Sequence, residues 1–121
     1  MLAEFELEFQ DCCRVLRLRG SWELQNHYEF RNVLDDILAH SDPRVVLNLA
    51  EVDHIGSSIM GAIIGFCQDV SKSGGAVYLA EPSDVTRATI RLLHLTDFFE
   101  IYSTERGAID ALCAERLQLR S

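Results

Sequence analysis

Residues 44–49 (RVVLNL) are the feature that most constrains the fold of this chain. Their apolar side chains follow one another too continuously for a strand with one solvent-exposed face. We therefore expect a central strand in a sheet that is covered on both faces. A second buried strand is predicted at residues 76–80 (AVYLA), and residues 57–72 between the two have helical spacing. A strand, a helix and a strand in this order predict parallel pairing through a right-handed crossover.

The N-terminal part predicts a β-hairpin. Residues 4–9 (EFELEF) alternate strictly and place Phe5, Leu7 and Phe9 on one face, which is typical of a half-buried strand. A short turn separates them from residues 12–19, which we expect to form the second strand.

Capping residues predict where the helices begin. Ser21 is the expected N-cap of the first helix, with Glu23 in its first turn. Asp84 is expected to cap a helix that ends near His94, and Thr104 to cap the last helix. The helix after Asp84 is expected to turn its apolar residues inward, namely Val85, Ala88, Leu92 and Leu93.

The predicted order of elements defines the fold class. It alternates strand and helix after the opening hairpin, with a short strand or extended piece at residues 98–102. We therefore expect an α/β fold in which a mixed, mostly parallel sheet of four or five strands carries four helices. Residues 1–121 are expected to form a single domain.

Charge and composition favour a protein partner. The net charge is −8, from 19 acidic and 11 basic residues, and such a surface repels nucleic acid and anionic lipid. No apolar run reaches the length of a membrane span. The acidic N-terminus lacks the basic region of an export signal, so we expect a cytoplasmic protein that is not inserted in a membrane.

The four cysteines predict neither a disulfide framework nor a metal site. No CxxC pair occurs, and Cys12 and Cys13 are adjacent. We therefore expect free thiols in a reducing compartment, no bound metal and no cofactor.

The junction Gly56-Ser57-Ser58 follows the most buried strand, at the edge where parallel sheets meet their ligands. Ser57 is the expected N-cap and Ser58 the first helical residue, with its hydroxyl near the positive end of the helix dipole. Three interpretations remain open here: a purely structural cap, a nucleophile, and a modified serine. Catalysis is the weakest, because the spacing of Gly56, Ser58 and Gly61 is not that of a nucleophile elbow and His54 has no readable relay.

Residues 45–112 resemble the STAS domain of bacterial anti-sigma factor antagonists. The resemblance rests on the strand at 45–49, the serine pair, Gly74-Gly75, and Leu95-Thr96 before the piece at 98–102. "LRGSWEL" at residues 18–24 is similar to the family's turn into its first helix, so nearly the whole chain is covered. The chain departs from the family pattern at four positions: Asn48 and Gly56 stand where the family has an acid, and Ile59 and Asp97 where it has a glycine.

The resemblance implies a regulatory role without enzymatic activity. Members of the family bind a serine kinase of the histidine-kinase-like ATPase type that doubles as an anti-sigma factor. Phosphorylation of the second serine, here Ser58, releases that partner, and a phosphatase reverses the modification. The alternative is an unswitched scaffold or transporter-accessory module in which the serines only cap the helix.

The surface around this junction is the expected partner-binding site. Ile59 and Met60 either enlarge an apolar docking face there or pack into the core, and Trp22 is either an interface anchor or a cover for the core edge. The residues expected to bind the partner are Glu23, Asp53, His54, Gly56, Ser57, Ser58, Ile59 and Met60.

Overall fold

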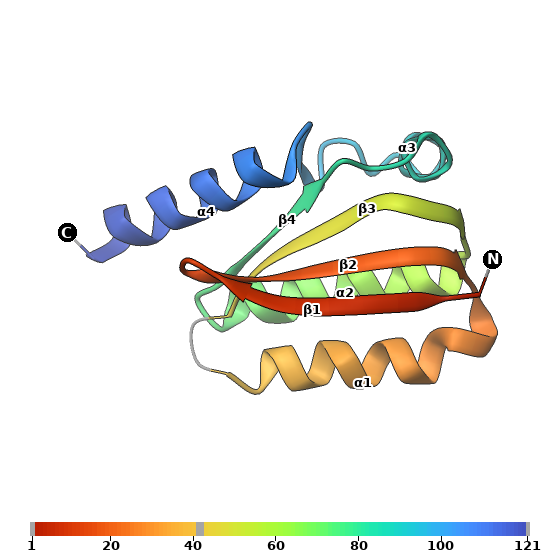
Figure 1. Ribbon diagram of the computed structural model, residues 1–121, viewed down its shortest axis with the longest axis horizontal. Coiled ribbons are helices and arrows are strands. Elements are labelled where there is room, and N and C mark those ends of the chain that lie inside the picture. The colour runs from red at the N-terminus through yellow and green to blue at the C-terminus, as the bar shows by residue number, and fades with distance from the viewer. Residues whose placement is uncertain (1, 41–42, 121) are drawn as a thin grey trace.

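A computed structural model describes residues 2–40 and 43–120, with side chains as far as residue 114. Figure 1 shows a single sheet with helices packed around it. The elements in chain order are β1 (Glu4–Gln10), β2 (Cys13–Trp22), a 3-10 turn (Leu24–Asn26), α1 (His27–Leu38), β3 (Arg44–Ile55), α2 (Ser57–Lys72), β4 (Ala76–Ala80), α3 (Asp84–Leu92), β5 (Glu100–Tyr102) and α4 (Glu105–Arg120).

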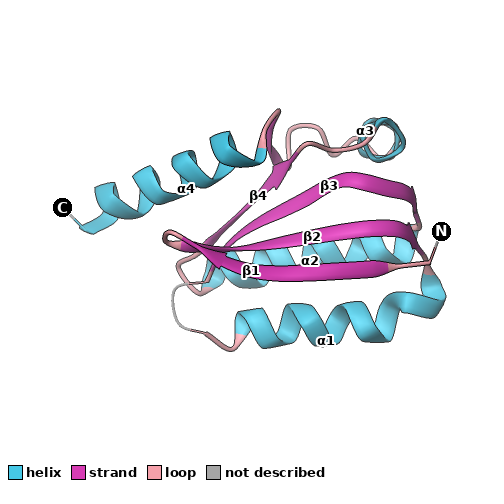
Figure 2. Ribbon diagram, viewed as in Figure 1, coloured by secondary structure: helices cyan, strands magenta, loops and turns pink. Residues whose placement is uncertain are grey.

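The sheet has five strands in the order β1-β2-β3-β4-β5 (Figure 2). β1 pairs with β2 antiparallel, and every later pair is parallel. The predicted fold class, a mixed and mostly parallel sheet with four α-helices, is therefore confirmed.

Apolar layers cover both faces of the central strands, as the continuous run in β3 predicts. Val45 and Leu47 face the main core, which α1 and α2 complete. Val46 faces the opposite way, into a smaller core completed by α4. In Figure 1, α1 and α4 accordingly lie on opposite sides of the sheet.

The first strand keeps its predicted alternation but does not bury its apolar face. Phe5, Leu7 and Phe9 remain 38%, 43% and 64% exposed. The expectation of a half-buried strand is wrong because β1 is the edge of the sheet, where the helices give less cover than they give β2.

The first helix begins later than predicted, and Ser21 is not its N-cap. β2 continues to Trp22, whose buried indole lies 5.5 Å from the ring of Phe30 in a tilted arrangement. The indole N–H donates to the Arg19 carbonyl at 2.9 Å. Burying this large side chain keeps residue 21 in the strand. Trp22 therefore covers the core and is not an exposed interface anchor.

The third helix also differs from the prediction. Ser83, not Asp84, is its N-cap, and the Ser83 hydroxyl accepts from the Thr86 amide at 3.3 Å. The helix buries Thr86 and Ile90, and it ends at Leu92 before His94 adopts a φ of 58°. The four residues expected to point inward are exposed instead, namely Val85, Ala88, Leu92 and Leu93. The predicted cap of the last helix is confirmed, because Thr104 Oγ1 accepts from the Gly107 amide at 3.0 Å.

A disulfide joins Cys12 to Cys113, so the expectation that all four cysteines are free thiols is wrong. The turn between β1 and β2 brings Cys12 under α4, where the two Cα atoms lie 5.7 Å apart. Spacing rules concern cysteines close in sequence, and these two are separated by 101 positions. Cys13 and Cys67 are free.

Candidate functional site

The serine pair lies where β3 ends and α2 begins. β3 runs to Ile55, so it extends beyond the strand predicted at residues 44–49 and reaches the junction directly. The Gly56 amide donates to the Trp22 carbonyl at 2.8 Å, which ties the junction to the end of β2. A register shift between Gly20 and Ser21 leaves Asp53 without a counterpart in β2. A register shift of this kind is a β-bulge, and bulges near functional sites change the direction in which a side chain points.

Gly56 is the N-cap of α2, in place of the predicted Ser57. Its carbonyl already accepts from the Met60 amide at 3.0 Å, so the helix starts one residue early and Ser58 becomes its second residue. Ser57 is exposed and Ser58 is partly buried. Within the described part of the chain, no side chain caps this end, and the first turn of α2 has no acid to compensate the positive end of the helix dipole.

A contact between the side chains of His54 and Glu23 borders the junction. His54 Nε2 lies 3.0 Å from Glu23 Oε1, and both side chains are about half exposed. Glu23 is also next to Gly56: a Cβ built on Gly56 would lie 3.5 Å from the Glu23 Cα. The structure thus brings Glu23 and His54 beside Gly56, Ser57 and Ser58, although Glu23 is far from them in sequence.

Ile59 and Met60 do not contribute to a docking face. They are 0% and 1% exposed and belong to the main core. A helix that starts at Ser57 turns both side chains toward the sheet, so the core-packing alternative holds for them. The exposed part of the expected surface therefore ends at Ser58.

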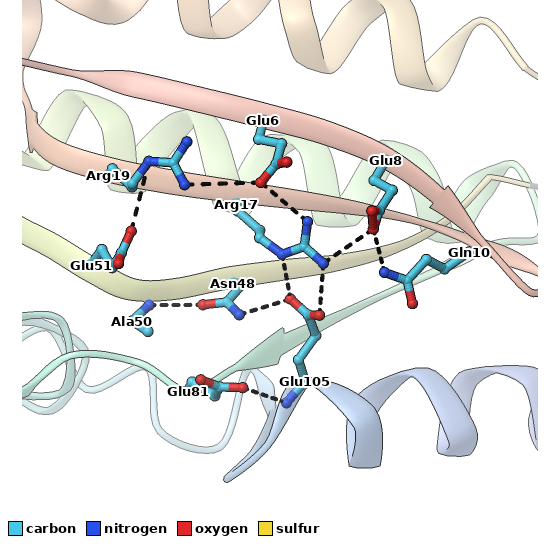
Figure 3. A network of polar contacts seen from close by, with 10 residues as sticks. All are labelled: Glu6, Glu8, Gln10, Arg17, Arg19, Asn48, Ala50, Glu51, Glu81 and Glu105. Atoms are coloured by element: carbon cyan, nitrogen blue, oxygen red, sulfur yellow. Dashed lines mark hydrogen bonds and ion pairs between the residues drawn. The ribbon is translucent and has the colours of Figure 1, made fainter.

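A network of polar contacts on the α4 side of the sheet was not foreseen (Figure 3). The Arg17 guanidinium binds both Glu105 oxygens at 2.8 Å, and Asn48 Nδ2 donates to Glu105 Oε1 at 2.9 Å. The Arg17 guanidinium, with the Asn48 amide, holds the pKa of Glu105 below its usual range. Glu81 accepts from the Glu105 amide at 2.7 Å and so caps α4.

This network explains why Asn48 replaces the acid that the family resemblance places there. An aspartate at position 48 would put a second carboxylate where the amide now donates to Glu105. In the sequence, the only sign of this contact was that Asn48 departs from the family pattern. Nothing in the spacing links Asn48 to a helix that starts 57 residues later.

Other features of the structure lie away from the serine pair. A cavity of about 680 Å³ is lined by the C-terminal half of α2, β4 and Phe98 to Glu100, at the far end of α2 from Ser58. In the described part of the chain, no group of three or more His, Cys, Asp or Glu side chains could hold a metal. Among the helices described, none is long and apolar enough to cross a bilayer.

Comparison with known proteins identifies the family. The STAS domain model matches residues 4–108. A Thermotoga maritima protein named as a candidate anti-sigma factor antagonist is 25% identical over 107 residues, which cover 88% of this chain and 95% of that protein.

Solved structures share the fold. An anti-sigma factor antagonist from Mycobacterium paratuberculosis is similar with a TM-score of 0.83 and 22% identity, over 92% of this chain and 94% of that one. The phosphorylated form of the Bacillus cell fate determinant SpoIIAA gives a TM-score of 0.70 and 22% identity, over 89% and 98% of the two chains. With the family model spanning most of the sequence, the chain belongs to the STAS domain family.

Proposed function

We propose that this chain is an anti-sigma factor antagonist that binds a serine kinase of the histidine-kinase-like ATPase type. The kinase would itself be the anti-sigma factor, and a phosphatase would restore the unmodified antagonist. The fold shared with SpoIIAA, which is known in a phosphorylated form, and the similarity to the Thermotoga protein support this proposal. We propose a single-domain binding module without enzymatic activity. Its proposed location is the cytoplasm, where the Cys12–Cys113 bond would be exposed to reduction.

The proposed partner surface contains the exposed and partly exposed residues at the junction, namely Glu23, Asp53, His54, Gly56, Ser57 and Ser58. The main observation behind the proposal is the position of Ser58 in the first turn of a helix whose N-terminus has no side-chain cap. The Ser58 hydroxyl makes no hydrogen bond within the described part of the chain. A hydroxyl without a structural partner is available as an acceptor for the γ-phosphoryl group of ATP.

Charge explains how phosphorylation would release the partner. A phosphate adds about −1.5 to −2 charges at neutral pH. The dipole of α2 tolerates that charge in the free protein, since no acid in the first turn competes for the helix end. A partner that packs over the unmodified hydroxyl would have to desolvate the phosphate at a junction that already carries the Glu23 carboxylate, which disfavours binding.

An unswitched scaffold or transporter-accessory module is the second candidate. Gly56 favours it, because this residue leaves the junction without the family's carboxylate. The partial burial of Ser58 also favours it, because it limits the access of a kinase to the hydroxyl. In that case a negative charge at position 58 would leave partner binding unchanged.

Co-purification with the kinase-type anti-sigma factor of the same genome tests the proposal. Wild type and Ser58→Ala should bind, and Ser58→Asp should not. Ser71→Asp is the matched control and should bind like wild type, because it places the same charge on an exposed serine of the same helix, outside the junction. Incubation with kinase and ATP should add one phosphate to the intact mass of wild type and none to Ser58→Ala. Equal binding by Ser58→Asp and wild type would favour the unswitched module.

A further inference from the structure

The outer edge of β1 is an open template for strand pairing. β1 is seven residues long and pairs on one side only, with β2 (Figure 1). An antiparallel edge strand directs half of its backbone N–H and C=O groups away from the sheet. Proteins usually protect such edges with proline, charged side chains, a bulge or a very short strand. Residues 4–10 contain no proline, lysine or bulge, and their three glutamates repel an acidic strand but not a basic one.

The two faces of β1 differ in chemistry. One face carries Phe5, Leu7 and Phe9, which stay partly exposed as described above. The other carries Glu4, Glu6 and Glu8, whose side chains are 64%, 49% and 42% exposed. A strand added to this edge would place its alternate side chains against an apolar stripe and an acidic stripe.

The acidic stripe is not neutralised by its own sheet. Arg17 lies 3.2 Å from Glu6 and 3.3 Å from Glu8 (Figure 3), but it is also bound by Glu105. Arg19 lies 3.9 Å from both Glu4 and Glu6. These two arginines contact five acidic residues on this side of the sheet, namely Glu4, Glu6, Glu8, Glu51 and Glu105.

A second copy of this chain does not fit the edge. An antiparallel pair that keeps the apolar stripes on one face sets glutamate opposite glutamate, such as Glu6 against Glu8 across Leu7. A register shifted by one residue sets glutamate against the apolar stripe instead. Like charges directly opposite one another destabilise a pair of strands.

We propose that the β1 edge binds an extended segment of a partner protein in which basic and apolar residues alternate. The segment adds a further strand to the sheet, with its Lys or Arg side chains beside Glu4, Glu6 and Glu8 and its apolar side chains beside Phe5, Leu7 and Phe9. Backbone pairing supplies the affinity, and charge complementarity selects the partner. This surface and its test do not depend on Ser58.

Titration of the isotope-labelled protein with the peptide Lys-Val-Lys-Phe-Lys-Val-Lys tests the proposal by NMR. We expect shift changes centred on residues 4–10 and slower hydrogen exchange of alternate β1 amides. The double variant Glu4→Lys, Glu8→Lys should weaken binding about tenfold, because two attractive cross-strand pairs become repulsive. This variant should in turn bind Glu-Val-Glu-Phe-Glu-Val-Glu. Glu51→Lys is the matched control on the same sheet face, away from the edge, and should bind like wild type.

Four outcomes would overturn the proposal. They are shift changes centred outside β1, equal binding of the basic peptide and a scrambled peptide of the same composition, equal loss in the Glu51→Lys control, and dimerisation of the wild type through β1 in light scattering. The last outcome would assign the edge to a second copy of the chain. Unchanged far-UV circular dichroism of each variant shows that it is folded.

Discussion

Breaking the Cys12–Cys113 bond is expected to destabilise the protein strongly. The bond closes a loop with a sequence separation of 101 residues, so it removes conformational freedom from almost the whole unfolded chain. Loop-closure entropy for about 100 residues corresponds to roughly 4.7 kcal/mol at 25 °C, and measured effects are typically about 2–4 kcal/mol. We therefore expect a loss of about 3–4 kcal/mol, which is a large share of the roughly 5–15 kcal/mol that holds a domain folded.

Urea unfolding with and without a thiol-free reductant measures this loss. Wild type should unfold at a lower urea concentration once reduced, and its melting temperature should fall by about 12–16 °C for an entropy of unfolding of roughly 2.1 cal/mol/K per residue. Cys113→Ser should resemble the reduced wild type and should not respond further to reductant. Thiol counting on the denatured, unreduced protein should detect two free cysteines, Cys13 and Cys67. Four free thiols, or the same unfolding midpoint in both redox states, would refute the reasoning.

Four further predictions concern the interior and the junction. Asn48→Asp should cost about 2 kcal/mol at neutral pH by unfolding in urea, because it sets a second carboxylate against Glu105, and the cost should shrink as acid protonates the pair. In wild type, the lowered pKa of Glu105 stabilises the fold above pH 4.5, the ordinary pKa of a free glutamate, and this contribution is lost as the pH falls through the lowered pKa. Gly56→Asp should raise stability by about 0.5 kcal/mol in thermal unfolding, since the φ of −82° suits any residue and the carboxylate can cap α2. Burial raises the pKa of Cys67 to about 12, so mass spectrometry should find it alkylated by iodoacetamide at pH 8 far more slowly in the native than in the unfolded protein.

Local patterns in the sequence predict the fold well where burial is continuous. The run in β3 and the helical spacing of residues 57–72 give the parallel core, because each signal reflects a face that must be covered. Helix starts are less predictable. Ser21 and Ser57 are good capping residues, but the burial of Trp22 and the early hydrogen bond to the Gly56 carbonyl decide where the chain turns.

The contacts that the sequence could not predict are long-range. The pairing of Cys12 with Cys113, the bidentate contact of Arg17 with Glu105, and the approach of Glu23 to the serine junction all depend on how elements meet in space. The register shift at Asp53 is equally invisible, because it arises between two strands and not within one. The position of the serine pair at a strand-to-helix junction was predictable, since it depends on neighbouring residues alone.

The affinity of the phosphorylated protein for its kinase-type partner tests the central claim most directly. Protein carrying one phosphate on Ser58, confirmed by intact mass, is compared by calorimetry with the same preparation after phosphatase treatment. Our account predicts binding at least about thirtyfold weaker for the phosphorylated form, the factor expected when a roughly 2 kcal/mol desolvation penalty enters the interface. Equal dissociation constants for the two forms would contradict it.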